Sequence, residues 1–186
     1  MTDQLSADAV VVGAGTSGCY FAWRLGQAGF HTIVLERHSL QDLGRDIDIF
    51  HMDGVRFDEF DLPHPTGDEL IAHHATGMAW SPDLEVQNEV RYAFYVMHKP
   101  AFQQRMHRYV REVGGEILEQ VEVTGPMVED GFLVGIRAQR DGRPVEVRGR
   151  LVIDASGIDG AVRTQLPAEL GVETDAISGD DTLFVC

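Results

Sequence analysis

The run of residues 9–36 constrains the fold of this chain more than any other feature. Its first part reads Ala-Val-Val-Val-Gly-Ala-Gly-Thr-Ser-Gly, and its last part reads Thr-Ile-Val-Leu-Glu. Short continuous apolar runs are typical of strands in a parallel sheet that is covered on both faces. The segment between them carries apolar residues at helical spacing. We therefore predict a buried strand, a glycine turn, a helix and a second buried strand, which together begin an α/β, Rossmann-like fold.

The glycine turn has the spacing of a dinucleotide-binding site. Gly13 allows a sharp turn, Gly15 lets the backbone approach a pyrophosphate, and Gly18 lets the helix pack closely on the sheet. The start of the helix then offers free N–H groups and the positive end of its dipole to phosphates. Glu36 follows Gly13 by 23 residues, close to the roughly 20 expected for an acid that binds ribose hydroxyls. The predicted cofactor-binding residues here are Gly13, Ala14, Gly15, Thr16, Ser17, Gly18 and Glu36.

The length, net charge and apolar runs of the chain exclude several classes of partner and location. A chain of 186 residues suffices for one domain or slightly more. Its net charge of −15 argues against nucleic acid and anionic membranes as partners, because both require basic surfaces. No apolar run approaches the roughly 20 residues that span a bilayer, and residues 1–8 lack the basic start and apolar core of a signal peptide. We therefore expect a cytoplasmic protein without an integral membrane segment.

The cysteines and histidines do not predict a metal site. The 2 cysteines, Cys19 and Cys186, are too few for a disulfide framework and form no metal motif. His73 and His74 are adjacent, without the spacing of helical metal ligands, so a surface or substrate-cavity position is the favoured interpretation. Cys19 lies near the start of the first helix, a position at which helix N-termini lower thiol pKa values. We expect instead a small buried residue packed on the sheet.

Residues 45–97 interrupt the expected alternation of strands and helices. Asp53-Gly54 is typical of a β-hairpin turn, and Thr76-Gly77 predicts a second hairpin. We interpret this stretch as an inserted, β-rich segment on the substrate side. Its predicted strands are residues 47–52, 55–60, 70–72, 78–80 and 92–97.

The rest of the chain returns to the nucleotide-binding fold. Pro100 opens a helix that ends at Gly114-Gly115, and residues ~121–153 have the turns and apolar runs of a β-meander. A further buried strand, residues 151–154, leads into a second glycine turn. We predict a nucleotide-binding domain from residues 1–44 and 98–166. The acidic, turn-rich residues 167–186 are interpreted as the start of a truncated or missing second half.

The charge of Glu36 and the order of elements narrow the choice of dinucleotide. A carboxylate at this position would repel a 2′-phosphate, so NADP is not expected there. A plain NAD-binding domain would continue with further strand–helix units after the second strand. Inserted hairpins, a helix and a meander favour FAD instead.

Three segments resemble the FAD-dependent oxidoreductases of the geranylgeranyl reductase type, within the wider p-hydroxybenzoate hydroxylase-like group of flavoproteins. The first is residues 13–36, followed by Arg37 as is frequent in FAD proteins. The second is residues 95–103 with the helix to Gly115, which is similar to a strand, Arg-Pro-x-Phe-Asp and helix in that family. The third is residues 151–163, which is similar to the family's Asp-Ala-Ser/Thr/Asp-Gly turn with a trailing Val-Arg.

The resemblance implies further cofactor contacts. The backbone of Val123 would hold the adenine, and the turn of Ala155, Ser156 and Gly157 would pass beside the cofactor. Arg45 is either a phosphate or ribose contact or a solvated loop arginine. Lys99 stands where the family usually has Arg, and keeps the charge but not the planar fork. Gln103 stands where the family often has Asp.

The resemblance also implies an activity, namely FAD-dependent reduction of a C=C bond in an organic small molecule, with NAD(P)H as transient reductant. A flavin monooxygenase of the same fold is an alternative. A third possibility is an incomplete, non-catalytic dinucleotide-binding fragment. The family's later Gly-Asp-Ala motif has no counterpart, since Gly179-Asp180 comes too early. The chain therefore resembles the N-terminal half of such an enzyme, whose other half is missing or supplied by a second chain, and no residue is predicted to be catalytic.

Overall fold

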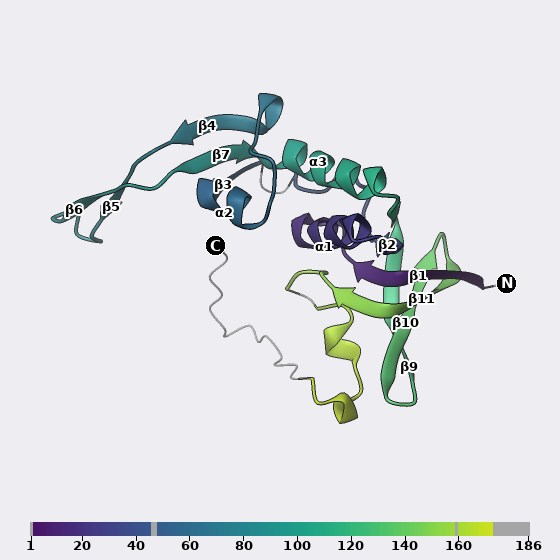
Figure 1. Ribbon diagram of the computed structural model, residues 1–186. Coiled ribbons are helices and arrows are strands. Elements are labelled where there is room, and N and C mark those ends of the chain that lie inside the picture. The colour runs from purple at the N-terminus through teal and green to yellow at the C-terminus, as the bar shows by residue number, and fades with distance from the viewer. Residues whose placement is uncertain (1, 46–47, 159, 173–186) are drawn as a thin grey trace.

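The apolar runs at residues 9–12 and 32–35 form two adjacent strands at the centre of a six-stranded sheet. The computed structural model describes residues 2–45, 48–158 and 160–172. The strand order is β8-β2-β1-β11-β10-β9 (Figure 1). The strands are β1 (Asp3–Val12), β2 (Thr32–Leu35), β8 (Glu116–Leu118), β9 (Val121–Glu129), β10 (Phe132–Arg140) and β11 (Arg143–Asp154).

The pairing in this sheet combines a parallel half with an antiparallel half. β1 pairs in parallel with both β2 and β11, and β2 pairs in parallel with β8. β10 pairs antiparallel with β9 and with β11. The predicted α/β, Rossmann-like fold with a β-meander is therefore confirmed.

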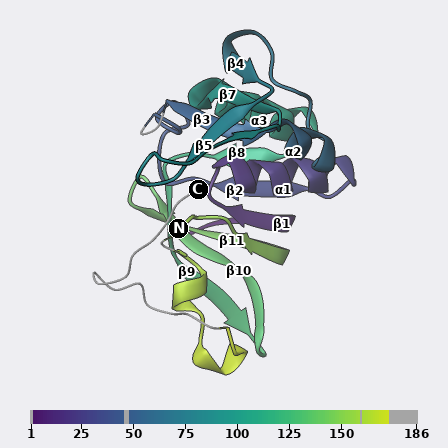
Figure 2. The ribbon, with the colours of Figure 1, turned by 90° about the vertical axis from the view of Figure 1, so that its left-hand side faces the viewer.

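The two faces of β1 and β2 support different layers, because successive side chains of a strand point to opposite faces. Val11 and Val34 join the core formed with α1 (Thr16–Gln27) and α3 (Lys99–Glu112). Val10 and Ile33 join a second core with the apolar residues of β9, β10 and β11. Figure 2 shows the helices on one side of β1 and β2 and the three meander strands on the other.

The helix predicted from Pro100 is α3, which begins one residue earlier, at Lys99. It packs on α1, where the rings of Trp23 and Tyr109 are stacked with their centroids 5.1 Å apart. This helix pair places the first turn of α1 directly beside buried polar residues of α3.

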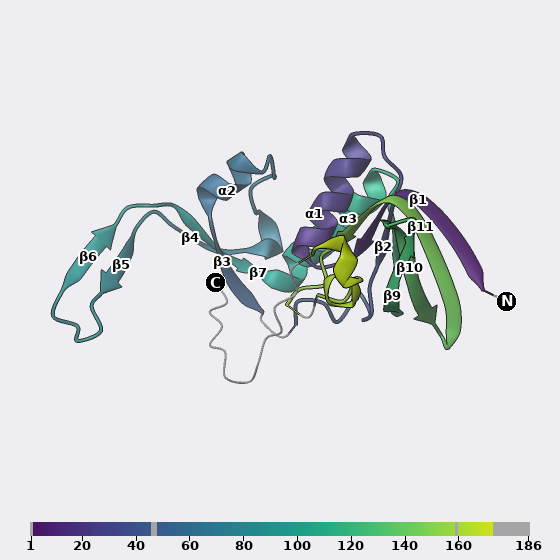
Figure 3. The same ribbon diagram turned by 90° about the horizontal axis from the view of Figure 1, so that it is seen from below.

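The segment between β2 and α3 builds two small separate sheets. The first has the order β3-β7-β4, and the second consists of β5 and β6, which extend away from the central sheet (Figure 3). The elements are β3 (Ile49–Asp53), α2 (Gly54–Glu59), the 3₁₀ helix η1 (Gly67–Glu69), β4 (Leu70–His74), β5 (Gly77–Trp80), β6 (Gln87–Val90) and β7 (Phe94–His98).

The hairpin predicted around Asp53-Gly54 is wrong. Residues 54–59 form helix α2, and β3 pairs with β7. Asp53 has φ −61°, whereas the hairpin turn indicated by Asp-Gly requires positive φ at both central residues. Gly54 and Phe57, three residues apart on one helical face, are both buried, so tertiary packing outweighs the local turn signal.

The hairpin predicted around Thr76-Gly77 is also wrong, although both of its strands exist. β4 pairs with β7, and β5 pairs with β6. The ring of His73 packs on that of Tyr95 with the ring centroids 4.8 Å apart, and the ring of His74 packs on that of Phe94 with the centroids 5.0 Å apart. These aromatic contacts across the sheet favour β7 as the partner of β4.

The last strand of the meander is longer than predicted. The strands predicted at residues 145–147 and 151–154 are parts of the single strand β11. Its first half pairs with β10, and it runs along β1 from Val145 to Asp154. The exposed polar residues Arg148 and Arg150 break the apolar pattern without breaking the strand.

The predicted division into domains stays a prediction. After β11 come the short 3₁₀ helices η2 (Arg163–Gln165) and η3 (Ala168–Leu170). The greater part of the predicted segment 167–186, including Gly179-Asp180 and Cys186, lies outside the described residues. In the described part of the chain, no helix has the length and apolar character needed to cross a bilayer.

Candidate dinucleotide-binding site

The first glycine turn is held by close contact with the second. Gly13 has φ +100°, and a Cβ atom on it would lie 2.4 Å from the carbonyl oxygen of Ala155. Both the backbone conformation and this contact therefore require glycine. The N–H of Ala155 also donates to the carbonyl of Val12 at 2.8 Å. The two turns, which are more than 140 residues apart in sequence, thus form one unit at the carboxyl ends of β1 and β11.

The other two glycines of the motif differ in what surrounds them. A Cβ atom on Gly18 would lie 1.9 Å from the carbonyl oxygen of Gly13, so α1 approaches the turn as closely as a backbone can. A Cβ atom on Gly15 would meet no atom within 4 Å. Gly15 is the N-cap of α1, where the first N–H groups of the helix have no partner inside it. The space beside Gly15 therefore fits a phosphate-bearing ligand.

Glu36 connects the end of β2 to the glycine turn. It is only 5% exposed. Its Oε2 accepts a hydrogen bond from the N–H of Ala14 at 2.8 Å, and its Oε1 accepts one from the N–H of His38 at 2.8 Å. Each carboxylate oxygen has a second acceptor position, so ribose hydroxyls and the protein backbone can share this side chain. The sequence did not predict the two backbone contacts.

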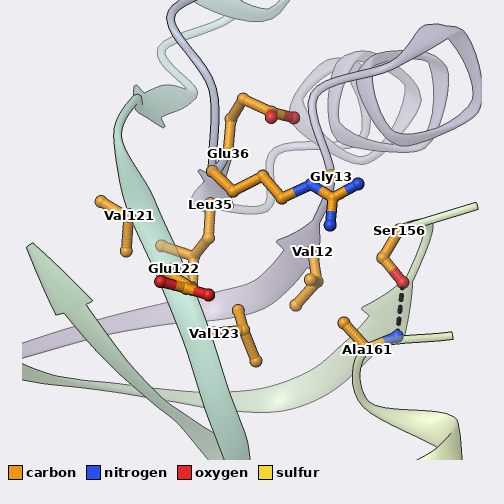
Figure 4. Close-up of a pocket in the computed structure, with 10 residues that line it drawn as sticks. Val12, Gly13, Leu35, Glu36, Val121, Glu122, Val123, Ser156 and Ala161 are labelled. Carbon is orange, nitrogen blue, oxygen red and sulfur yellow. Dashed lines mark hydrogen bonds between the residues drawn. The ribbon is translucent and has the colours of Figure 1, made fainter. Parts of the chain in front are cut away.

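A pocket of about 110 Å³ lies beside Glu36, enclosed by the ends of β1 and β2, by β9 and by the second glycine turn (Figure 4). A volume this small accommodates one part of a dinucleotide, since sites for whole ligands usually measure about 300 to 1,000 Å³. Five predicted residues line it, namely Gly13, Glu36, Arg37, Val123 and Ser156. The residues that sequence reasoning missed are Val12, Leu35, Val121, Glu122 and Ala161.

The missed residues have recognisable positions. Val12 and Leu35 each immediately precede a predicted site residue at the end of a parallel strand, where α/β proteins bind their ligands. Val121 and Glu122 belong to β9, which is the edge strand of the sheet. An edge strand leaves backbone groups unpaired on its outer side; the backbone role of Val123 stays a prediction. Arg37 donates from Nε to Nε2 of His38 at 3.1 Å.

The remaining predicted residues lie around the turn but do not line this pocket. Arg45 is exposed, and Lys99 is half-buried at the start of α3. A Cβ atom on Gly44 would lie 3.4 Å from Cγ of Lys99, so the loop that carries Arg45 passes close to the start of α3. Ser17 is exposed and Gly157 is exposed with φ +85°.

A second cavity, of about 310 Å³, opens beside the first turn of α1. It lies between α1, α2, β3 and α3. Most of its lining is apolar, and its residues are Thr16, Ser17, Tyr20, Phe21, Met52, Arg56, Phe60, Leu62 and Met106.

Asp154 holds the second glycine turn together. Its Oδ1 accepts hydrogen bonds from the N–H and the hydroxyl of Ser156 at 3.1 and 2.5 Å. Its Oδ2 accepts from the N–H groups of Val162 and Arg163 at 2.9 and 2.8 Å. Burial by itself raises the pKa of this carboxyl, but the hydrogen bonds from Ser156, Arg163 and Val162 outweigh it and leave the pKa below its ordinary value of 3.8.

This lowered pKa predicts acid sensitivity of the turn. The folded chain holds Asp154 ionised more firmly than the unfolded chain does, so its stabilising effect is present above pH 3.8 and is lost as the pH falls further. We expect Asp154→Asn to be less stable than the wild type at pH 7, with the difference shrinking below pH 3.8. Urea unfolding at several pH values measures this. The exposed Asp3→Asn serves as control, and a gap for Asp154→Asn that does not change with pH would contradict the prediction.

Buried polar side chains of α3 meet the turn from its inner side. The carbonyl oxygen of Ala14 accepts hydrogen bonds from Nε2 of Gln103 at 2.6 Å and from Nε2 of His107 at 3.0 Å. Oε1 of Gln103 accepts from the hydroxyl of Thr16 at 3.3 Å. Burial lowers the pKa of His107. Sequence reasoning noted Gln103 only as a departure from the family pattern and did not identify His107.

Cys19 also belongs to this buried cluster. Its Sγ lies 3.2 Å from the carbonyl oxygen of Ala14, to which it donates. Burial, with a smaller effect of the charge on Glu36, raises the pKa of the thiol to about 12. The thiolate is therefore suppressed, and the packing role favoured from the sequence agrees with the structure.

The fold and the glycine turn together define a Rossmann-like, dinucleotide-binding class of protein. A family model described as an NAD(P)-binding Rossmann-like domain matches residues 11–61, which contain both the turn and Glu36.

Within that class, the chain resembles the geranylgeranyl reductase type of flavoprotein, as its motifs predict. The digeranylgeranylglycerophospholipid reductase of Sulfolobus acidocaldarius is 24% identical over 174 residues, which cover 92% of this chain and 38% of the relative. The protein of the same name from Methanosarcina acetivorans is 26% identical, with 83% of this chain and 39% of the relative covered. The chain thus spans about two fifths of the length of these curated relatives.

Solved structures confirm the fold. A geranylgeranyl bacteriochlorophyll reductase-like protein from Thermoplasma acidophilum superimposes with a TM-score of 0.79 at 17% identity, covering 87% of this chain and 42% of the other. A myxobacterial chondrochloren halogenase, described as FAD-dependent, superimposes with a TM-score of 0.70 at 20% identity. The match covers 87% of this chain and 39% of the halogenase. The curated relatives therefore confirm the predicted resemblance, and the solved structures confirm the fold.

Proposed function

We propose that this chain binds FAD and forms part of an oxidoreductase that reduces a C=C bond of an organic small molecule. The observation that carries the proposal is the open space beside Gly15, at a turn fixed by the contact between Gly13 and Ala155. This is the arrangement that lets a backbone approach a pyrophosphate. The similarity to proteins named as reductases supports the reaction type.

Each part of the site has a role in this proposal. The first turn of α1 binds the pyrophosphate, and Glu36 accepts hydrogen bonds from the adenosine ribose. Val123 and the apolar ends of β1 and β2 contact the adenine in the pocket. Bound FAD supplies the hydride chemistry, and NAD(P)H is the proposed transient reductant. The largely apolar cavity beside Thr16 supports an apolar substrate.

A flavin monooxygenase is the second candidate. The p-nitrophenol 4-monooxygenase of Pseudomonas putida shares the fold, with a TM-score of 0.66 at 16% identity and coverage of 82% of this chain and 41% of the other. Uptake of O₂ that accompanies NAD(P)H oxidation and substrate hydroxylation would favour this candidate over the reductase. A chain that binds FAD but oxidises no NAD(P)H would favour the third possibility, a dinucleotide-binding module without turnover.

Replacement of Gly15 tests the cofactor. We expect the wild-type chain to bind FAD with quenching of flavin fluorescence, and we expect Gly15→Ala to bind it about tenfold more weakly or worse, because the methyl group enters the space for the pyrophosphate. A fluorescence titration measures both affinities. Gly77→Ala is the matched control, since Gly77, like Gly15, lies outside the positive-φ region and a Cβ atom there would come no closer than 3.9 Å to another side chain. Wild-type protein that does not bind FAD would overturn the proposal.

A further inference from the structure

The peptide group between Ala14 and Gly15 is held in place by side chains of α3. Its carbonyl oxygen is the common acceptor for Gln103 and His107. Both side chains are almost completely buried, at 2% and 3% exposure. Their Nε2 atoms lie 3.0 Å apart, within hydrogen-bond distance of each other. His107 can donate to the Ala14 carbonyl only as the Nε2–H tautomer, because an unprotonated Nε2 would instead accept from Gln103; we adopt the Nε2–H tautomer.

The preceding peptide group is fixed as well. The N–H of Ala14 donates to Oε2 of Glu36 at 2.8 Å. Ala14 is therefore held through its N–H from the end of β2 and through its carbonyl from α3. The side chains that hold it come from segments of the chain that are 67 residues apart or more.

This arrangement determines the direction of the Gly15 N–H. A trans peptide group is planar, with its C=O and N–H pointing in opposite directions, and the described residues contain no cis peptide bond. Because the Ala14 carbonyl points toward Gln103 and His107, the N–H of Gly15 points away from α3. Gly15 itself borders open space, since a Cβ atom on it would meet nothing within 4 Å.

We propose that Gln103 and His107 are positioning residues that aim the Gly15 N–H at the pyrophosphate of the bound dinucleotide. This inference rests on the proposed function and adds to it, because neither side chain lines the pocket beside Glu36. An amide suits the position of Gln103, since its Nε2 donates to Ala14 while its Oε1 accepts from Thr16. An ionised carboxylate at the same position has no hydrogen to donate to the Ala14 carbonyl.

A comparison of two ligands separates positioning from general support of the fold. ADP carries the pyrophosphate, whereas adenosine has only the parts proposed to contact Glu36 and Val123. We expect Gln103→Met, which keeps the length of the side chain, to weaken ADP and FAD binding about tenfold. Adenosine binding should change less than about threefold. Isothermal titration calorimetry on the purified chain measures all three affinities.

His107 provides an independent pair of variants. His107→Gln keeps a donor nitrogen within reach of Ala14, and we expect it to retain ADP affinity within about threefold. His107→Leu removes the donor, and we expect it to lose ADP affinity about tenfold while adenosine binding changes little. Thermal unfolding of each variant shows whether it is folded. If Gln103→Met does not fold, the His107 pair carries the test alone.

The outcomes distinguish this inference from the proposed function. Wild-type chain that binds none of the three ligands overturns the proposed function and the inference with it. Wild-type chain that binds FAD and ADP, with variants that weaken ADP and adenosine equally, overturns only the positioning role. Equal ADP affinity of wild type, Gln103→Met and His107→Leu overturns it as well.

Discussion

Gly18→Ala is expected to lower the free energy of unfolding by about 3 kcal/mol, the upper part of the range for overpacked sites. The new methyl group would lie 1.9 Å from the Gly13 carbonyl oxygen and 3.3 Å from Cβ of Ala155. The nearest atom belongs to the backbone of a turn that is itself in contact with the second glycine turn, so no flexible side chain can move aside. Helix propensity alone would favour alanine by roughly 1 kcal/mol, and the prediction is therefore opposite in sign to the local preference.

Chemical denaturation followed by circular dichroism measures the effect. Gly15→Ala is the matched control, because it lies three residues away and its Cβ atom meets nothing within 4 Å. We expect it to cost no more than about 1 kcal/mol, as a less favourable N-cap residue. A Gly18→Ala variant as stable as Gly15→Ala would show that α1 can shift away from the turn, and would contradict the close packing.

The second large effect is expected at the buried ion pair between α3 and η1. Nη2 of Arg105 lies 2.7 Å from Oε1 of Glu69, and both side chains are less than 10% exposed. Nη1 of Arg105 also donates to the carbonyl of Pro63 at 2.6 Å, and the guanidinium lies over the ring of Phe102 at 5.2 Å. We expect Glu69→Leu to cost about 3 to 5 kcal/mol, because it leaves a buried charge without its partner.

A double-mutant cycle separates the pair from its surroundings. Glu69→Leu combined with Arg105→Met should recover much of the loss, since a buried ion pair contributes little compared with well-packed apolar residues. The exposed pair of Arg24 and Asp61, 2.9 Å apart, provides the contrast, and Asp61→Asn, which also tolerates the φ of 51° at this position, should cost less than about 1 kcal/mol. Equal losses for Glu69→Leu and for the double variant would show that Arg105 is not the cause.

The ion pair of Arg105 and Glu69 joins the inserted segment to the helix that supports the dinucleotide site. Arg105 lies on the same helix as Gln103 and His107, and Glu69 precedes β4 directly. Burial raises the pKa of Glu69, and the charge and hydrogen bond of Arg105 oppose that change. The position of α3 relative to the glycine turn therefore depends on contacts from both sides of the helix.

Much of the candidate site could be predicted because its signals are local. A continuous apolar run followed by glycines at fixed spacing predicted β1, the turn and α1 without reference to the rest of the chain. The acid at the end of β2 followed from its distance to Gly13. Pro100 and the helical spacing after it located α3 to within one residue.

The strand pairing of the insertion could not be predicted in the same way. Asp53-Gly54 is a strong local turn signal, yet β3 pairs with residues 94–98. Such pairing depends on side-chain packing between distant segments, here including the burial of Phe57, and this outweighs the preference of two adjacent residues. For the same reason, β4 pairs with β7 and not with its neighbour β5.

The sequence by itself determined that a glycine turn joins a buried strand to a helix and that an acid ends the next strand, because these features depend on residues close together in the chain. Only the tertiary structure decided what holds that turn. The Ala155 carbonyl against Gly13, the backbone contacts of Glu36, and the donors Gln103 and His107 join segments up to about 140 residues apart. Hydrogen bonds and close contacts of this kind arise only when the folded sheet and helices bring those segments together.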